Sequence, residues 1–351
     1  MTIAAFDLVP YALPLREPVV WGGQAHVQRR GVLVRIEGAD GAVGWGDAAP
    51  LPGFSAESLD QARAELVALA EVLRGRELTP AEALLGGSVA TALDAAGLSP
   101  SARFGLDLAL AELAAQELGR TLPQALHPDP AVVLPLNGLV MGGGSLAVAS
   151  AKRLGEQGYP AVKLKVGRQP VDDDLPLVTA VRKALPDAVA LRLDANRAWG
   201  WDDAVRFAEG VRGLALDYIE EPLRDASRLP ELWHDTGLPV AVDESVQEGA
   251  PIRGWATAAV LKPTLVGGIG ATIRRATEAR LVGVRPVLSA AFESGVGLRG
   301  IAALAAATGA EPAGLDTYRW LAADVLGPLP FDRPRVDVAG LFSMPPEIAL
   351  P

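Results

Sequence analysis

The chain has 351 residues, half of them apolar, with 32 basic and 42 acidic side chains, three histidines and no cysteine. This length can bury a large core, as one big domain or two unequal ones, and the missing cysteines exclude disulfides, zinc–thiolate sites and cysteine nucleophiles. A net charge of -10 without a block of basic residues argues against broad nucleic-acid binding.

The sequence contains no run of 18 apolar residues, and it does not open on a basic segment followed by a hydrophobic one. It therefore predicts neither a membrane span nor a signal peptide, and a cytoplasmic protein is the default expectation. We expect no membrane partner and no obligate protein partner. An anionic small-molecule substrate would need local positive charge from lysines or from a metal with oxygen or imidazole ligands.

The N-terminal part reads as strands and turns followed by helices. Residues 30–37 and 42–47 flank turn residues and predict a hairpin. Residues 79–82 (TPAE) combine an N-cap, a proline at the first helical position and a glutamate three residues on, which is a capping-box signature. Residues 101–118 follow a helical pattern, so this part of the chain is an α+β unit.

From about residue 132, short apolar runs alternate with helical segments. Successive runs end 19 to 29 residues apart, at Lys165, Asp194, Glu220, Asp243, Lys262 and Ser289. Each interval holds one strand and one helix, which predicts a parallel sheet. Seven or eight such units predict a closed (β/α) barrel, whereas a Rossmann sheet would need a glycine fingerprint that is absent after the first strand.

Three acidic residues, Asp194, Glu220 and Asp243, close three successive strands. The carboxyl ends of barrel strands converge on one site, so these carboxylates should lie side by side. Hard oxygen ligands without a thiol suit Mg²⁺, with Mn²⁺ as a substitute. None of the three histidines falls at a strand end, which argues against a histidine-type zinc site.

Lysines flank the carboxylates. Lys163 and Lys165 are two apart and point to the barrel interior, and Lys165 on the second strand should face Lys262 on the sixth across the mouth. Lys163 and the cation should disfavour the charged form of Lys165 and leave it able to act as a base near neutral pH. The metal would stabilise the enediolate that forms on deprotonation next to a carboxylate.

A single acidic residue at a strand end is more often a helix cap or a surface residue, but chemistry-bearing residues on five consecutive strands are harder to dismiss. Arg192 and Asn196 are candidate auxiliary residues with Lys163, and ordinary capping or solvation remains the alternative for both. Glu293 and Ser294 follow the seventh strand, and for both of them substrate binding and a structural role are equally good interpretations.

Five short motifs occur in order, namely KLK at 163–165, LDAN at 193–196, IEEP at 219–222, VDES at 242–245 and LKP at 261–263. As a set they resemble the enolase superfamily, in its muconate-lactonising subgroup, over essentially the whole chain. The resemblance implies a capping domain over 1–125, a (β/α)₇β barrel over 126–318 and a C-terminal segment, 319–351, that returns to the capping domain. It also implies that Asp194, Glu220 and Asp243 bind the metal and that Lys165 and Lys262 are catalytic.

Local stretches at 44–58, 192–199, 261–268 and 289–294 resemble the o-succinylbenzoate synthases of menaquinone biosynthesis. The resemblance implies that 44–58 closes over the substrate. From physical reasoning alone, the preferred interpretation of this stretch is instead a structural Gly/Pro turn that Ser55 caps. Asp47 departs from the glutamate expected in many relatives. The residues expected to bind substrate are Phe54, Ser55, Ser289, Glu293 and Ser294.

The implied reaction is the Mg²⁺-dependent syn dehydration of 2-succinyl-6-hydroxy-2,4-cyclohexadiene-1-carboxylate to o-succinylbenzoate. Lys165 would remove the proton alpha to the carboxylate and then protonate the departing hydroxyl. Lys262 would stay protonated over the opposite face of the ring.

Three other functions stay open. An N-succinylamino acid racemase or another epimerase could use the same scaffold. A Schiff-base aldolase could use Lys165 or Lys262, would need no metal and would be trapped by borohydride. The chain could also be a silent barrel that acts as a binding scaffold, but its complete set of lysines and carboxylates argues against that.

Overall fold

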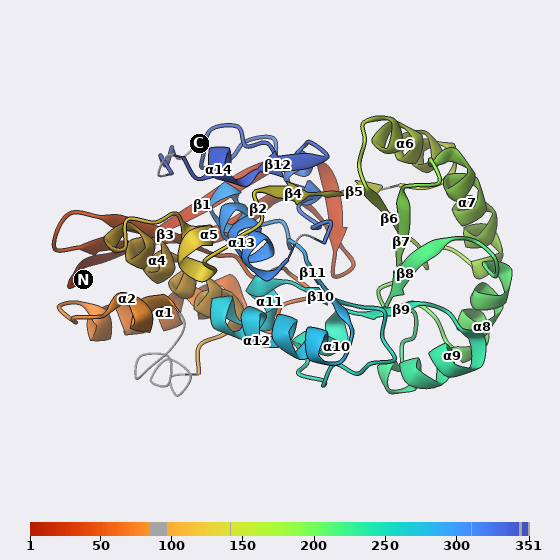
Figure 1. Ribbon diagram of the computed structural model, residues 1–351, viewed down its shortest axis with the longest axis horizontal. Coiled ribbons are helices and arrows are strands. Elements are labelled where there is room, and N and C mark those ends of the chain that lie inside the picture. Colours follow the sequence, from red (N-terminus) through yellow and green to blue (C-terminus); the bar gives the residue numbers. More distant parts are fainter. Residues whose placement is uncertain (85–96, 141, 310, 344–345, 350–351) are drawn as a thin grey trace.

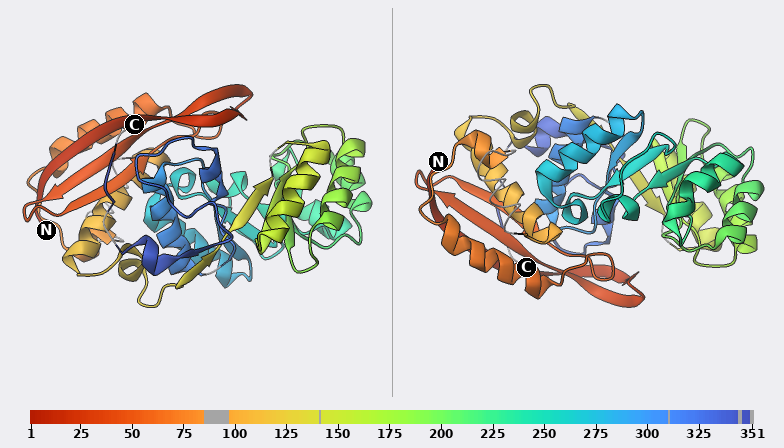
Figure 2. Two further views of the ribbon diagram at one scale, coloured as in Figure 1. Left: turned by 90° about the horizontal axis from the view of Figure 1, so that it is seen from above. Right: turned by 90° about the horizontal axis from the view of Figure 1, so that it is seen from below.

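The computed structural model describes residues 1–351 except 85–96, 141, 310, 344–345 and 350–351. The chain begins with a three-stranded antiparallel sheet of β1 (Ile3–Trp21), β2 (Gln24–Gly38) and β3 (Val43–Ala48). The predicted hairpin is confirmed as β2 and β3, whereas the sequence did not reveal the long strand β1. The β1–β2 hairpin projects from the sheet toward the middle of the molecule (Figure 2).

Helices α1 (Leu59–Leu73) and α4 (Pro100–Glu117) pack on this sheet, and the short helices α2 (Pro80–Leu84) and α5 (Leu122–Leu126) pack on α4. The capping box before α2 is confirmed, because the Thr79 N–H donates to the Glu82 carboxylate at 2.8 Å and the Glu82 N–H donates to the Thr79 hydroxyl at 3.3 Å. Helix α4 lies directly on β3, where a Cβ atom added to Gly46 would stand 1.7 Å from the Gly105 carbonyl oxygen. The two backbones can approach this closely only because β3 carries glycine there.

A second, parallel sheet of seven strands curls around the other half of the molecule (Figure 1). Its strands follow chain order and are β5 (Asn137–Val140), β6 (Ala161–Lys165), β7 (Ala190–Asp194), β8 (Leu216–Glu220), β9 (Val240–Val242), β10 (Ala258–Leu261) and β11 (Arg285–Leu288). The longer helices that follow these strands are α6 (Gly144–Glu156), α7 (Val171–Ala184), α8 (Trp201–Gly210), α9 (Leu229–Thr236), α12 (Gly268–Leu281) and α13 (Gly295–Thr308). Short helical turns are η1 (Ala226–Arg228), α10 (Glu244–Gln247), α11 (Pro263–Val266) and η2 (Asp316–Trp320).

The gap between β11 and β5 is closed by the short segment 313–314. Ser289 bridges to Gly314 and Leu136 bridges to Ala313, both in parallel. This segment takes the place of the predicted eighth strand, and it is brief because η2 begins at Asp316. The (β/α)₇β architecture with an α+β cap is therefore confirmed.

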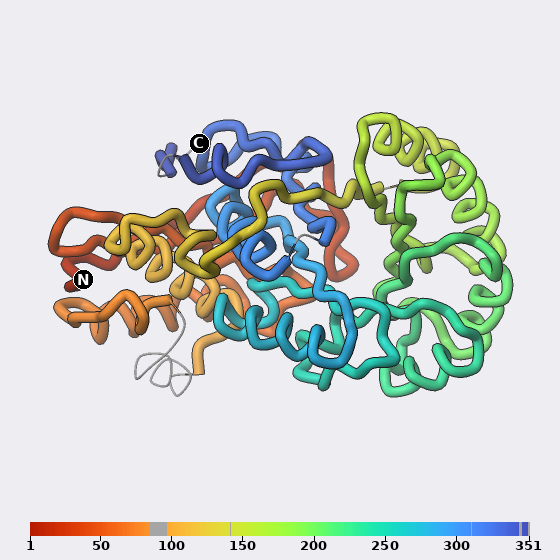
Figure 3. The backbone as a smooth tube through the Cα atoms, in the orientation of Figure 1, coloured from red at the N-terminus to blue at the C-terminus, as the bar shows by residue number. Residues whose placement is uncertain are grey.

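The C-terminal segment lies against the first half of the chain (Figure 3). Strand β12 (Arg335–Asp337) pairs antiparallel with β4 (Val133–Pro135) and leads into α14 (Val338–Leu341). The Ala322 N–H also donates to the Pro14 carbonyl of β1 at 2.8 Å. Among the described residues, no helix has the length and apolarity to cross a membrane.

Candidate active site

One cavity lies between the carboxyl ends of the barrel strands and the capping hairpin, with about 820 Å³ of space including its solvent-open part. The barrel contributes Lys163, Lys165, Asp194, Asn196, Lys262 and Ser289 to its wall. The capping domain contributes Val19, Val20, Trp21, Leu51 and Phe54. Both predicted catalytic lysines thus face one cavity that the two domains form together.

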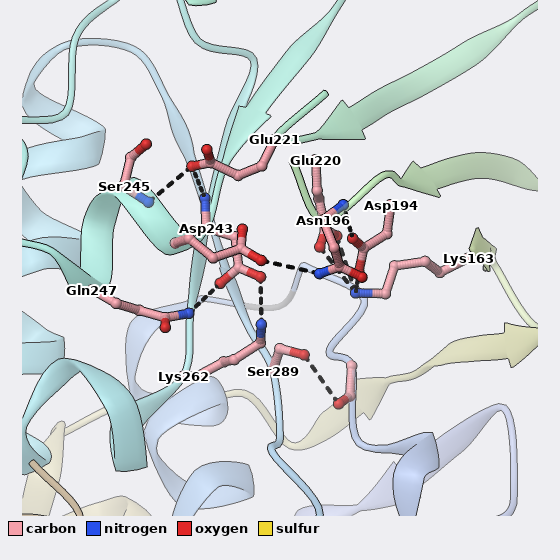
Figure 4. Close-up of polar contacts among 12 residues, drawn as sticks. Lys163, Asp194, Asn196, Glu220, Glu221, Asp243, Ser245, Gln247, Lys262 and Ser289 are labelled. Atoms are coloured by element: carbon pink, nitrogen blue, oxygen red, sulfur yellow. Dashed lines mark hydrogen bonds and ion pairs between the residues drawn. The ribbon is translucent and has the colours of Figure 1, made fainter. Parts of the chain in front are cut away.

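Lys163 joins two carboxylates inside the barrel. Its Nζ lies 3.0 Å from Glu220 Oε2 and 3.3 Å from Asp194 Oδ2 (Figure 4). Burial alone would lower the pKa of Lys163, but the charges of Glu220 and Asp194 outweigh burial and raise the pKa well above its usual range. Lys163 is therefore held as a cation and is unsuited to act as a base in this state.

Lys165 lies nearer the cavity. Its Nζ is 2.6 Å from Asp194 Oδ2 and 2.6 Å from Asn196 Oδ1, and the Asn196 amide in turn donates to Glu244 Oε1 at 3.0 Å. The side chain of Lys165 is 19% exposed, compared with 11% for Lys163. Two acceptors therefore orient the Lys165 ammonium while leaving it open to the cavity.

Lys262 binds the carboxylate of Asp243, which also accepts a 2.7 Å hydrogen bond from Gln247 Nε2 (Figure 4). Burial would lower the pKa of Lys262, but the charges of Asp243 and Glu244 raise it above its usual range. The structure thus favours a protonated Lys262. Lys165 ends β6 and Lys262 directly follows β10, and these two strands are separated by three strands of the curled sheet.

The three predicted metal ligands, Asp194, Glu220 and Asp243, are at most 1% exposed. Burial raises the pKa of Glu220 to about 8, with Lys163 opposing the shift and the charges of both aspartates adding to it. Burial also opposes ionisation of Asp194, but Lys165 and Lys163 outweigh it and lower its pKa below the usual range. The carboxylates are thus close enough to repel one another, a condition that a divalent cation relieves.

Within the described part of the chain, no three acidic or histidine side chains stand at the spacing of a completed metal site. The oxygen atoms of the three carboxylates are instead held by Lys163, Lys165 and Lys262. The donor set is nevertheless the hard-oxygen set that Mg²⁺ prefers. A cation would take over part of the charge compensation that the ammonium groups provide.

Glu221 fixes the turn that carries Asp243. It is fully buried with a positive φ of 39°, and its Oε1 accepts hydrogen bonds from the N–H groups of Asp243 at 3.0 Å and Ser245 at 2.9 Å. Its Oε2 accepts from Arg197 Nε at 3.1 Å. Glu221 is therefore a positioning residue for the third carboxylate, and the IEEP motif supplies it next to Glu220.

Two of the five predicted substrate-binding residues, Phe54 and Ser289, line the cavity. Ser55 instead accepts a 2.9 Å hydrogen bond from the Leu51 N–H and lines a separate cleft on the capping domain. This arrangement matches the capped turn that physics alone favoured.

Glu293 and Ser294 have their polar atoms occupied within the protein. Glu293 accepts from the Thr264 hydroxyl and the Ala291 N–H, each at 2.6 Å. The Ser294 N–H and hydroxyl donate to Asp47 Oδ2 at 2.9 and 2.7 Å. Asp47 thereby joins β3 to the start of α13, so the shorter acid at this position still reaches across the domain boundary.

Arg192 lies below the mouth, inside the barrel. Its Nε donates to Asp217 at 2.8 Å and its Nη1 to the Pro312 carbonyl at 2.7 Å. An apolar cluster that includes Tyr218 and Val287 fills the adjacent interior. Arg192 thus ties β7 to the segment that closes the barrel, whereas Asn196 and Lys163 contact the proposed catalytic groups directly.

Arg29 is a functional candidate that sequence reasoning missed. It is 2% exposed and donates from Nε to the Phe292 carbonyl at 3.0 Å, from Nη1 to the Pro50 carbonyl at 2.7 Å, and from Nη2 to the Ala49 carbonyl. It therefore clamps the capping segment to the barrel loop that lines the cavity. An arginine within a strand pattern gives no local signal of such long-range contacts.

Three further cavity-lining side chains, Trp21, Asn137 and Thr317, were also missed. Among the described residues, Trp21 Nε1, Asn137 Oδ1 and Thr317 Oγ1 are buried without a hydrogen-bond partner. Unpaired buried polar atoms are costly, so their occurrence in three residues of one cavity wall is a feature that packing alone does not explain.

Comparison with known proteins agrees with this geometry. A family model described as enolase C-terminal domain-like matches residues 146–346, and one described as the MenC N-terminal domain matches residues 3–113. The L-Ala-D/L-Glu epimerase of Bacillus subtilis has a similar structure, with a TM-score of 0.82 and 25% identity over 93% of each chain.

Among curated proteins, the o-succinylbenzoate synthase of Pasteurella multocida (strain Pm70) is 31% identical over 98% of both chains. Protein PHYLLO, chloroplastic, of Arabidopsis thaliana is 33% identical over 85% of this chain, which spans only 20% of that protein's length. The chain belongs to the enolase superfamily, and within that superfamily to the o-succinylbenzoate synthase family.

The Arg29 clamp generates a stability prediction. We expect Arg29→Met to lower the free energy of unfolding by about 3 kcal/mol, because four buried carbonyl groups lose their donor. Exposed Arg30→Met is the matched control and should change stability by less than about 0.5 kcal/mol. Urea denaturation followed by circular dichroism measures both, and equal stability of the two variants would refute the clamp.

Proposed function

We propose that this protein is a Mg²⁺-dependent hydro-lyase that converts 2-succinyl-6-hydroxy-2,4-cyclohexadiene-1-carboxylate to o-succinylbenzoate for menaquinone biosynthesis. The observation that carries the proposal is the joint placement of Lys165 and Lys262 on one cavity, with three buried carboxylates behind them, in a chain of this family. Such a site suits proton removal from carbon next to a carboxylate.

Asp194, Glu220 and Asp243 would hold the Mg²⁺, with Mn²⁺ as a substitute. The bound cation would supply positive charge to the substrate carboxylate as negative charge develops on it. Lys163 balances the charge of Asp194 and Glu220 from inside the barrel, and Asn196 orients Lys165. Glu221 holds Asp243 in place from behind.

Lys165 is the proposed base and acid. In its neutral form, Nζ takes the proton from the ring carbon that carries the carboxylate. The same ammonium then gives a proton to the departing hydroxyl, which leaves as water while the ring becomes aromatic. One lysine on one face serves both transfers, so the elimination is syn.

Lys262 is proposed to remain protonated on the opposite face. Its burial beside Asp243 and the raised pKa favour the ammonium form. A fixed cation near the ring stabilises a delocalised anion without taking a proton. The two lysines therefore have different tasks, set by their different surroundings.

An N-succinylamino acid racemase, or another epimerase, is the second candidate. The structural likeness to the Bacillus subtilis epimerase and the lysine on each face of the cavity favour it. Racemisation by proton transfer needs a base on one face and an acid on the other, whereas syn dehydration needs only one face.

Metal dependence is the first test. Exhaustive EDTA treatment should abolish turnover and added Mg²⁺ should restore it, and Asp243→Asn should abolish activity by weakening the all-oxygen site. Asp235→Asn, on the exposed surface of α9, is the control and should keep normal activity. Full activity after EDTA, together with borohydride trapping of a substrate adduct, would instead support the aldolase.

The roles of the lysines are the second test. Lys165→Ala and Lys262→Ala should each lower kcat by roughly 10²–10⁴-fold or more while the fold stays native by circular dichroism. Lys152→Ala, on the exposed face of α6, should leave kcat unchanged. Near-normal turnover in either active-site variant would show that the two-lysine site is wrongly assigned.

Reaction preference is the third test. We expect kcat/KM for the cyclohexadiene substrate to exceed that for any N-succinylamino acid by at least about tenfold, which corresponds to roughly 1.4 kcal/mol in transition-state stabilisation. Both constants should be measured on one preparation, with proton exchange of the amino acids followed in D₂O. If racemisation equals or exceeds dehydration, the racemase assignment replaces the synthase.

A further inference from the structure

One cation in the cavity wall differs from the three lysines. Arg168 lines the cavity in the turn after β6, three residues beyond Lys165, so that their Cα atoms are at most about 11 Å apart. The lysines each bind a carboxylate, whereas the exposed side chain of Arg168 makes no hydrogen bond or ion pair with any described residue. Its five N–H donors are available to a ligand.

The turn that carries Arg168 is fixed on both sides. The Val166 N–H donates to the Asp194 carbonyl at 2.9 Å, and the Gly167 N–H donates to Asp174 Oδ2 at 2.7 Å. Gly167 has a φ of 75°, and a Cβ added there would lie 2.5 Å from the Ala198 Cβ. The backbone of Arg168 is thus anchored to the strand end that carries Asp194, even though its side chain is exposed.

Other donors in the same wall also lack partners. The Trp21 indole N–H can only donate, and the Thr317 hydroxyl can donate as well as accept. The carboxylate of Asp316 lines the cavity too, but it is bound by Arg319 at 2.5 Å and by the Leu139 N–H at 2.7 Å. The unpaired atoms of the wall also include the Asn137 oxygen, which only accepts, so Arg168 is the charged donor in this wall that an anionic ligand group away from the metal ligands would meet.

We propose that Arg168 binds the second carboxylate of a dicarboxylate substrate and so selects for the succinyl arm. This inference rests on the proposed function, in which the ring carboxylate belongs beside Asp194, Glu220 and Asp243. The succinyl arm ends in another carboxylate, which lies away from the reacting carbon. A planar guanidinium can bind that group in a bidentate manner, and a neutral arm would gain nothing from it.

Equilibrium binding to the Mg²⁺-loaded full-length protein separates this role from catalysis. The probes are o-succinylbenzoate and o-butyrylbenzoate, which has a methyl group in place of the arm's carboxylate. Isothermal titration calorimetry measures the Kd of each ligand. Arg168→Gln should raise the Kd for o-succinylbenzoate about tenfold and change the Kd for o-butyrylbenzoate less than about twofold. Arg168→Lys should recover part of the loss, because it restores charge without the bidentate geometry.

The control is Arg212→Gln, an exposed arginine in the turn before β8, at the opposite end of the barrel. It removes the same charge from the protein and should affect neither ligand. Equal weakening of both ligands by Arg168→Gln, or no weakening of o-succinylbenzoate, would overturn the proposal. So would wild-type protein that binds the two ligands equally.

Failure of the proposed function has a different signature. If the wild type racemises N-succinylamino acids but does not dehydrate the cyclohexadiene, the synthase proposal is wrong. The role of Arg168 is then tested by measuring KM in the wild type and in Arg168→Gln for the N-succinyl and N-acetyl forms of one amino acid. Arg168→Gln should raise KM about tenfold for the succinyl form alone, and an equal change for both forms would reject its role.

Discussion

The pairing of buried ammonium and carboxylate groups at the barrel mouth governs the rest of this structure. Transferring one such ion from water into the interior costs several kcal/mol, so each charge persists only beside an opposite one. The parallel register supplies these pairs, because Lys165 lies beside Asp194 on β6 and β7, and Asp194 beside Glu220 on β7 and β8. An apolar substitution at one position would strand its neighbour's charge.

Much of the barrel could be predicted from sequence because its order is local. Each strand pairs with the next one along the chain, so strand ends such as Asp194 and Lys262 reveal their own position in the ring. The length of β1 and the clamp at Arg29 could not be predicted in this way. Strand β1 belongs to the separate antiparallel sheet and is long because it pairs with β2 along nearly its whole length, and the clamp depends on a contact from Arg29 to the distant Phe292 carbonyl.

The position of a residue at a strand end predicts the location of its side chain well, but it predicts the binding partner of that side chain poorly. Arg192, Glu293 and Ser294 were all read as candidates for the site, yet their polar groups bind Asp217, backbone N–H groups and Asp47. A buried polar atom takes the nearest partner that satisfies it, and sequence spacing does not reveal which partner that is. All of these residues are as buried as the proposed ligands, so the hydrogen-bond partner, and not burial, separates the two groups.

The capping segment is attached to the barrel more firmly at its base than at the tip of the hairpin. Arg29 and Asp47 fasten the base of the capping segment to the barrel, whereas the tip of the β1–β2 hairpin meets residues 52–53 through Gly22 and Gly53. A Cβ on Gly22 would lie 2.8 Å from the Gly53 Cα, so the two backbones touch there, and the neighbouring Trp21 packs edge-on against Phe292 of the barrel loop with ring centroids 4.8 Å apart. A side chain added to either glycine would therefore push the hairpin tip away from residues 52–53 and displace the part of the cavity wall that Trp21 forms.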